Sequence, residues 1–127
     1  MITTVLVFGT YDKFHPGHEY FLTQAKSYGD RLVVVIARDH NVAKLKRNSP
    51  TNSENKRLQV IKQFSAVDEA MLGLEDFSKK ESIIDIIAPD VICLGYDQAP
   101  NFQSPNSNIK IVRIDAFYPE KYKSSLL

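Results

Sequence analysis

Short, continuous apolar runs separated by amphipathic stretches constrain the fold of this chain most strongly. Residues 32–36 (LVVVI) and 91–94 (VICL) are apolar throughout and do not alternate with polar residues. Strands with this pattern are typical of a parallel sheet that is covered on both faces. The sequence predicts five such strands, of which the third is the weakest. They are residues 4–8, 31–37, 69–72, 90–94 and 109–114.

Three stretches with helical periodicity lie between these strands. Pro16 suits the first turn of a helix and Gly29 suits a C-terminal stop, while Ser53 suits an N-cap. Alternation of strands and helices implies right-handed crossovers and an α/β fold. We therefore expect one Rossmann-like, doubly wound domain over residues 1–127, with a five-stranded parallel sheet flanked by helices. The expected helices are residues 16–28, 53–64 and 79–87.

The composition argues against several classes of function. With 16 basic and 15 acidic residues, the net charge is +1, which gives no reason to expect a nucleic-acid or membrane partner. No apolar run is long enough to span a bilayer, and the N-terminus lacks the features of a signal peptide. The one cysteine, Cys93, cannot form an internal disulfide or a metal-binding cysteine set. A reducing cytoplasm is the expected location.

Polar segments follow three of the predicted strands. Residues 9–18 (GTYDKFHPGH) follow the first strand, residues 38–52 follow the second, and residues 96–108 follow the fourth. In an open α/β sheet, ligands bind outside the carboxyl ends of the strands, at the switch point. We therefore expect these three segments to converge on one edge of the sheet.

A histidine pair lies where the first strand leads into a helix. Gly9 allows a tight turn with close approach of a ligand, and Pro16 places His15 at the mouth of the helix and His18 in its first turn. The N–H groups of a helix start form an anion site, to which two imidazoles add donors for a phosphate whose charge builds up during transfer. Gly17 would let a nucleotide lie against the helix. The alternatives are two surface histidines, or a metal pair, which is weaker because no third His or Cys lies nearby.

Residues 9–18 resemble the G-T-F-D-x-x-H-x-G-H signature of the cytidylyltransferase-like nucleotidyltransferases. Comparable segments occur at residues 37–39 (ARD), 67–69 (VDE), 89–92 (PDVI) and 94–98 (LGYDQ). The last segments in this list look closest to those of the archaeal-type FAD synthases, which are FMN adenylyltransferases. The glycerol-3-phosphate cytidylyltransferases are closely related to them. In this family the phosphate of a monoester attacks the α-phosphorus of a nucleoside triphosphate, and pyrophosphate leaves.

The resemblance implies a nucleotidyltransferase that uses ATP and FMN to form FAD. One alternative keeps the chemistry but uses CTP with glycerol 3-phosphate or another small phosphate monoester. A second alternative is a nucleotide-binding module without catalysis. Since the family is often dimeric, a homodimer is the default expectation.

The resemblance also assigns roles to the signature residues. His15 and His18 would hold triphosphate oxygens and stabilise the transition state, and Thr10 with the nearby backbone would contact phosphate. Asp12 would orient the site or help to hold Mg²⁺, the expected cofactor, which would be bound mainly through the nucleotide phosphates. The implied nucleotide-binding set also includes Gly9, Tyr11 and Gly17.

Basic residues beyond the signature also match family positions. Lys44 and Lys46 match basic residues of the loop after the second strand, where a solvated charge run is the alternative. Lys44 is the expected catalytic residue of this pair. Arg57 matches a helix arginine that would reach phosphate, or would instead pair with Glu54 on the helix surface.

The remaining candidates lie near the C-terminal half of the predicted sheet. Gly95 and Asp97 match the segment that borders the nucleoside, although Gly and Asp also favour a simple turn. Ser124 and Ser125 resemble the beginning of a Ser/Thr-rich motif that leads, in the family, into a helix facing the triphosphate.

Overall fold

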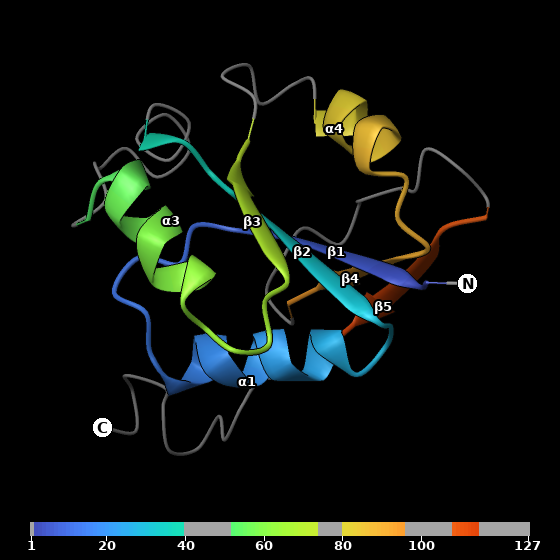
Figure 1. Ribbon diagram of the computed structural model, residues 1–127, viewed down its shortest axis with the longest axis horizontal. Coiled ribbons are helices and arrows are strands. Elements are labelled where there is room, and N and C mark those ends of the chain that lie inside the picture. Colours follow the sequence, from blue (N-terminus) through green and yellow to red (C-terminus); the bar gives the residue numbers. More distant parts are fainter. Residues whose placement is uncertain (1, 40–51, 74–79, 96–107, 115–127) are drawn as a thin grey trace.

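The computed structural model describes residues 2–39, 52–73, 80–95 and 108–114, which form a five-stranded parallel sheet with flanking helices (Figure 1). The strand order is β3-β2-β1-β4-β5, so the order reverses between β1 and β4. The predicted α/β fold and its parallel sheet are confirmed. The strands are β1 (Thr4–Gly9), β2 (Arg31–Ile36), β3 (Glu69–Leu72), β4 (Val91–Leu94) and β5 (Lys110–Arg113).

Three helices connect the described strands, and each begins within one residue of its predicted start. They are α1 (Pro16–Lys26), α3 (Glu54–Lys62) and α4 (Lys80–Ile87). Ser53 caps α3, as predicted, because its Oγ accepts a hydrogen bond from the Lys56 N–H at 3.2 Å. The first helix ends earlier than predicted, since Ser27 closes it and the Gly29 N–H donates to the Lys26 carbonyl at 3.1 Å. None of these helices has the length and apolar character needed to cross a membrane.

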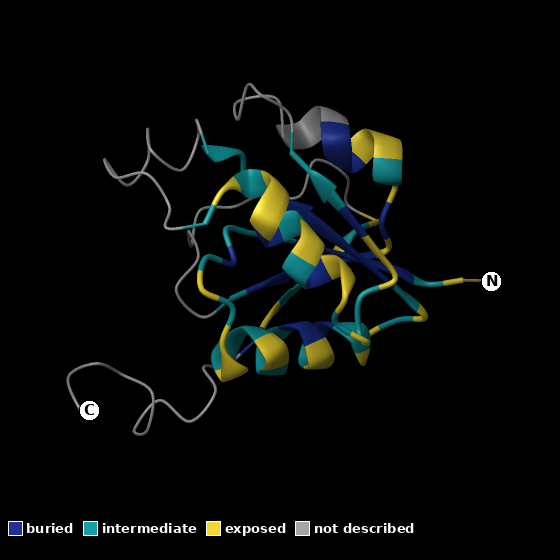
Figure 2. Cartoon of the chain, turned by 60° about the vertical axis from the view of Figure 1, so that its left-hand side comes forward, coloured by how far each residue is buried: buried dark blue, intermediate teal, exposed yellow. Residues whose placement is uncertain are grey.

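Side chains from the two faces of the sheet pack into two apolar layers. Val7 points to the layer that contains Leu22 of α1 and Ile61 of α3. Its neighbour Leu6 points to the opposite layer, with Ile84 of α4. Because successive residues of a strand point to opposite faces, a strand covered by helices on both sides must be apolar at every position. Figure 2 shows this arrangement as buried strands between helices whose outer sides are exposed.

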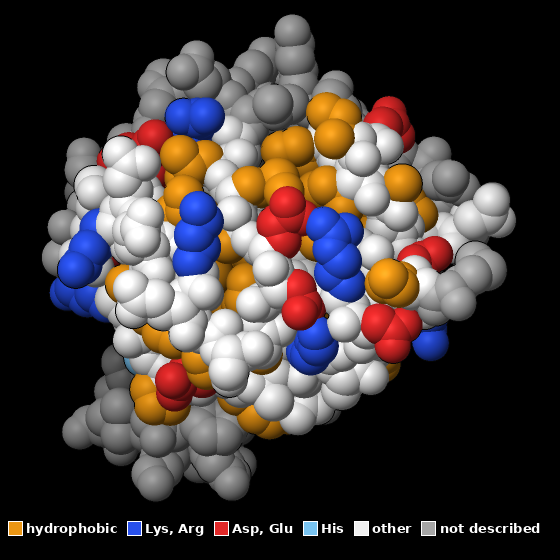
Figure 3. All heavy atoms as spheres, viewed as in Figure 1, with side chains coloured by type: hydrophobic (Ala, Val, Ile, Leu, Met, Phe, Trp, Pro, Cys, Tyr) orange, Lys and Arg blue, Asp and Glu red, His pale blue; other side chains and the backbone are white. Residues whose placement is uncertain are grey.

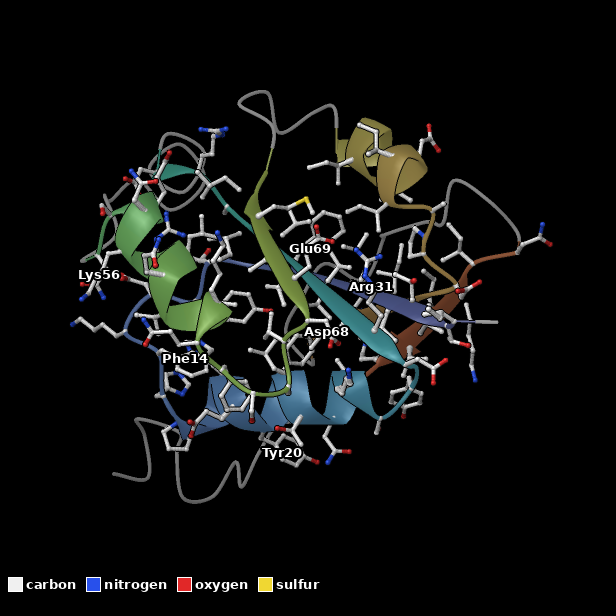
Figure 4. All side chains as sticks on the ribbon, viewed as in Figure 1. Phe14, Tyr20, Arg31, Lys56, Asp68 and Glu69 are labelled. Carbon is white, nitrogen blue, oxygen red and sulfur yellow. The ribbon has the colours of Figure 1, made fainter. Side chains whose placement is uncertain are left out.

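Charged side chains hold the amino-terminal edge of the sheet. Asp68 accepts a hydrogen bond from the Leu32 N–H at 2.7 Å and forms an ion pair with Lys26. The hydrogen bond from Lys26, followed by that from Leu32, lowers the pKa of the Asp68 carboxyl. Arg31 and Glu69 form a second ion pair close by (Figure 4), and acidic and basic side chains alternate over this face (Figure 3). These contacts fix β2 against β3 at the edge opposite to the signature segment.

Candidate functional site

The two histidines of the signature cap the first helix reciprocally. His15 is the N-cap of α1, and its Nδ1 accepts a hydrogen bond from the Gly17 N–H at 3.0 Å. In return, Nδ1 of His18 accepts a hydrogen bond from the His15 N–H at 3.4 Å. The arrangement is a capping box in which imidazoles take the places of the usual hydroxyl and carboxylate. The structure therefore places His15 at the mouth of the helix and His18 in its first turn, as predicted.

The capping bonds determine which ring nitrogen carries the hydrogen. A neutral imidazole whose Nδ1 accepts a hydrogen bond must carry its hydrogen on Nε2. We assign this form to both rings, so each presents an Nε2–H on the side away from its backbone contact. The ring centroids of His15 and His18 lie 3.8 Å apart, with 23° between the planes. The pair is therefore one compact unit with two N–H donors, the kind of group that phosphate oxygens accept.

Aromatic rings surround His18, which is half-buried, whereas His15 is exposed. The ring of Phe14 is stacked with that of His18, with centroids 5.7 Å apart and 19° between the planes. Tyr11 meets His18 edge to face, at 5.3 Å and 79°. Phe14 in turn meets Phe64 edge to face at 5.5 Å, and Figure 4 shows Phe14 between the start of α1 and α3.

Gly17 has a role within the protein itself. A Cβ atom at this position would lie 2.8 Å from Cε1 and 3.0 Å from Nδ1 of His15. The missing side chain therefore makes room for the imidazole that caps the helix. The predicted contact between Gly17 and a nucleotide stays a prediction, now with a second reason for the glycine.

Tyr11 turns back into the core instead of facing outward. Its φ of 54° is uncommon for a residue with a side chain, and only 6% of it is exposed. The ring covers Gly9, where a Cβ would lie 2.5 Å from Cε2 of Tyr11. The tyrosine ring fills the space of a Gly9 side chain, which is a reason for the glycine within the protein, and the predicted ligand contact at Gly9 stays a prediction. The predicted nucleotide contact at Tyr11 stays a prediction.

The hydroxyl of Tyr11 is buried without a hydrogen-bond partner among the described residues. Burial raises the pKa of the Tyr11 phenol far above its ordinary value, and the nearby Cys93 raises it further. Burial also raises the pKa of the Cys93 thiol, to about 11. Neither group would ionise in the folded protein near neutral pH, which excludes both as bases in the site.

Arg57 is buried behind the signature segment, with 0% of its side chain exposed. Its Nη1 donates to the Thr10 carbonyl at 2.8 Å, its Nη2 to Oδ1 of Asp39 at 2.6 Å, and its Nε to the Asn52 carbonyl at 3.2 Å. The predicted direct contact with phosphate is therefore wrong, because protein acceptors enclose the guanidinium. The alternative pairing with Glu54 is also wrong, since Asp39 is the carboxylate partner of Arg57.

Residues at the end of β2 and the start of α3 complete this network. Glu54 pairs with Arg38 at 3.3 Å, and Glu54 and Asp39 each accept the other's backbone N–H, at 2.9 and 3.1 Å. Asp12 joins the signature segment to the same helix start, because its Oδ1 accepts the Asn52 N–H at 2.9 Å. The carboxyl ends of β1 and β2 are thus held to the start of α3 as one hydrogen-bonded unit.

Six predicted site residues remain. The structure describes Gly95 but not the other five. Gly95 follows β4, next to β1 in the sheet, and its carbonyl accepts a hydrogen bond from Nη1 of Arg113 at 2.6 Å. It therefore lies at the same edge as the signature segment. The predictions for the remaining five fall outside the described residues. They are Lys44, Lys46, Asp97, Ser124 and Ser125.

Sequence reasoning missed several residues that organise the site. It gave no individual role to Asp39 or Asn52, whose partners come from segments distant in the chain. It also passed over Phe14, which occupies a variable position of the signature. The signals were present: Asp39 belongs to a segment that resembles the family, and Phe14 directly precedes His15.

Comparisons with known proteins show which sequences and folds this chain resembles. Residues 6–123 match the family model described as Cytidylyltransferase-like. An FAD synthase of Methanosarcina barkeri is 44% identical over 105 residues, covering 81% of this chain and 71% of that protein. An FAD synthase of Methanosarcina acetivorans is 46% identical over 100 residues, covering 77% and 62%. An FAD synthase of Thermococcus sibiricus is 36% identical over 129 residues, covering 96% and 84%.

A solved structure supports the same relationship. The lipopolysaccharide core biosynthesis protein from Thermoplasma volcanium GSS1 is 36% identical, with a TM-score of 0.78 over 92% of this chain and 99% of that one. The similarity therefore includes both sequence and fold. The chain spans only 71% and 62% of the length of the two Methanosarcina relatives.

Proposed function

Because the chain belongs to the cytidylyltransferase-like family, we propose that it is a nucleotidyltransferase that joins ATP to FMN, forming FAD and releasing pyrophosphate. The observation that carries the proposal is the pair of capping imidazoles at the carboxyl end of β1. The end of β1 lies beside the end of β4, where the strand order reverses and where open α/β sheets bind their ligands. The relatives named FAD synthase support the choice of substrates.

The chemistry needs positioned donors more than it needs a base. An oxygen of the acceptor phosphate attacks the α-phosphorus, and the bond from that phosphorus to the bridging oxygen of the β-phosphate breaks. The acceptor phosphate already carries negative charge, so no proton has to be removed from it. Negative charge builds on the triphosphate oxygens, and the Nε2–H groups of His15 and His18 would donate to them. Backbone N–H groups of the segment that includes Thr10 would add further contacts.

Magnesium fits this site as a companion of the nucleotide. Among the described residues, no group of three or more His, Cys, Asp or Glu side chains is arranged to hold a metal ion. Asp12 is the one carboxylate of the signature segment, and its Oδ1 already accepts the Asn52 N–H. A single carboxylate suits Mg²⁺, which is commonly held by one or two carboxylates together with substrate phosphates and water. When bound, the ion would neutralise triphosphate charge.

The other assignments belong to the same proposal. Lys44 would contact the transferred phosphate and Lys46 would help to hold the triphosphate, while Gly95 and Asp97 would border the nucleoside. A role for Ser124 and Ser125 beside the triphosphate, a homodimer and a cytoplasmic location are also proposed. Arg57 has a different part from the one expected, because it fixes the Thr10 carbonyl and not a phosphate.

The test is a matrix of substrates. The purified chain with Mg²⁺ is incubated with ATP or CTP, and with FMN or glycerol 3-phosphate, while pyrophosphate release and the products are measured. FAD formed only in the reaction of ATP with FMN is the expected result. CDP-glycerol formed from CTP would assign the chain to the alternative chemistry. Nucleotide binding without pyrophosphate release from any pair would leave a binding module and overturn the proposal.

A further inference from the structure

Two of the contacts that hold the imidazole of His18, a capping bond and ring stacking, differ in strength. Its capping bond, from the His15 N–H to Nδ1, measures 3.4 Å, against 3.0 Å for the bond from Gly17 to His15. A bond of this length lies beyond the usual range for N–H donors and orients a ring only weakly. The torsion that turns a histidine ring is also broad and roughly two-fold. The capping bond by itself therefore does not keep Nε2–H in one direction.

Neighbouring rings also hold the imidazole. Phe14 and His15 are both nearly parallel to His18, at 19° and 23°. The stacked rings fix the plane in which the imidazole lies. The imidazole can occupy that plane in two flipped orientations, and the capping bond selects one of them. Phe14 is half-buried and meets Phe64 edge to face, so it is itself fixed. The rings form a continuous row from His15 through His18 and Phe14 to Phe64.

Residues in and directly after α3 support both ends of this part of the signature segment. Phe64 follows α3, and Arg57 within α3 donates to the Thr10 carbonyl at 2.8 Å. Between these two supports, Tyr11 and Lys13 have positive φ values of 54° and 53°. Such conformations are strained for residues with side chains and persist only where the surroundings enforce them. Phe64 and Arg57 thus set where Phe14 can lie.

We propose that Phe14, braced by Phe64, is a positioning residue that holds the imidazole of His18 with its Nε2–H toward the triphosphate. The inference rests on the proposed function, in which His18 donates to the substrate. Phe14 itself would not touch the substrate. Its removal should therefore lower kcat through His18 and leave substrate binding largely intact.

The first experiment measures kcat, KM and the histidine ring resonances of the whole chain. Phe14→Leu is expected to lower kcat about 10-fold, with KM for ATP changed by less than about 3-fold, because small misplacements of a donor cost much of its effect. The ring protons of His18 should shift, and the nitrogen spectrum should show a mixture of Nδ1–H and Nε2–H forms. The chain has three histidines, so the resonances of His18 are assigned by their absence from a His18→Gln variant.

Matched variants separate positioning from a general loss of stability. Phe14→Tyr keeps the ring and should restore kcat and the resonances to near the unmodified values. Phe21→Leu is the control, because Phe21 is half-buried on α1, packs against the same core and makes no ring contact within the described residues. It should leave kcat and the His18 resonances unchanged. If Phe14→Leu does not fold, Phe64→Leu removes only the brace and should shift both readouts in the same direction.

A double variant decides whether Phe14 acts through His18. In a His18→Gln background, Phe14→Leu should have no further effect on kcat. An additive loss there, or unchanged kcat and unchanged His18 resonances in Phe14→Leu itself, would overturn the inference. If His18→Gln alone leaves turnover intact, the catalytic role that the proposed function gives to His18 fails, while the activity itself stands. The resonances of the substrate-free protein would then still report whether Phe14 orients the ring.

Discussion

Tyr11→Phe removes one oxygen atom from the protein interior and leaves the rest of the side chain in place. The hydroxyl is buried and has no hydrogen-bond partner among the described residues. A buried polar group without a partner costs about 1–3 kcal/mol of folding free energy. The void left by one oxygen offsets this by a few tenths of a kcal/mol, at about 24 cal/mol per Å³. The ring still covers Gly9 and still meets His18, so other packing is retained.

The variant should therefore be more stable than the unmodified chain by about 1–2 kcal/mol, which at roughly 4 °C per kcal/mol raises Tm by about 4–8 °C. Urea unfolding should show a higher midpoint with an unchanged slope, because the area exposed on unfolding hardly changes. Tyr28→Phe is the control. Tyr28 is 43% exposed, so loss of its hydroxyl should change the stability by less than about 0.5 kcal/mol.

Alkaline pH gives an independent check on the same reasoning. The folded state holds the pKa of the Tyr11 phenol above its ordinary value of 10.0. Above pH 10 the unfolded chain therefore loses this proton while the folded protein keeps it, which favours unfolding. The advantage of Tyr11→Phe should widen as pH rises above that value. If Tyr11→Phe is instead the less stable protein at neutral pH, the hydroxyl has a hydrogen-bond partner and the reasoning fails.

Three further predictions concern the site and its surroundings. His18→Gln keeps a side-chain acceptor for the helix cap but loses the imidazole, so kcat should fall about 10²–10³-fold with little loss of stability; steady-state assays and thermal unfolding measure both, and unchanged turnover would exclude His18 from catalysis. Arg57→Lys keeps the charge but cannot reach three acceptors, and should lower the free energy of unfolding by about 2–4 kcal/mol in urea titrations. Equal stability of the variant and the unmodified chain would mean that the three hydrogen bonds of the Arg57 guanidinium contribute little to the free energy of unfolding. Because the pKa of Cys93 rises from 9.0 to about 11 on burial, the unfolded chain alone releases this proton between those pH values, and the protein should lose up to roughly 2–3 kcal/mol over that interval. Cys93→Ala should lack this loss, and an identical pH profile would contradict the burial argument.

The parts of the fold that sequence predicted best are those set by local pattern. The runs that became β2 and β4 are apolar at every position because helices cover both faces of the sheet. Helix starts were also predictable, since Pro16 and Ser53 have local capping roles. The end of α1 was less so, because it depends on how residues 27–30 pack back toward β1. There the Asp30 N–H donates to the Thr3 carbonyl at 2.8 Å, a contact between distant residues.

In the site, too, the residues placed by local sequence pattern were predictable, and those placed by distant contacts were not. The positions of His15 and His18 follow from spacing and from the proline between them, and both are local features. The environment of Arg57 does not, because its three acceptors come from three separate segments and a charged side chain on a helix is normally solvated. One sign was available: Arg57 lies four residues before Ile61, and the two share the buried side of α3. Helical periodicity alone would have placed Arg57 inside, against the expectation from its charge.

Burial of this arginine has a consequence for how the site keeps its shape. Removing one partner from a buried charge is costly, so the acceptors of Arg57 are coupled, and a shift in any one of them is opposed by the others. Those acceptors are the Thr10 carbonyl of the signature segment and two residues between β2 and α3. Phe64, which follows the end of α3, adds an apolar contact to Phe14. The direction of the histidine N–H donors therefore depends on α3, although the buried side chains of this helix contact other parts of the protein and not the substrate. Substitutions on its inner face should consequently alter turnover more than substrate affinity.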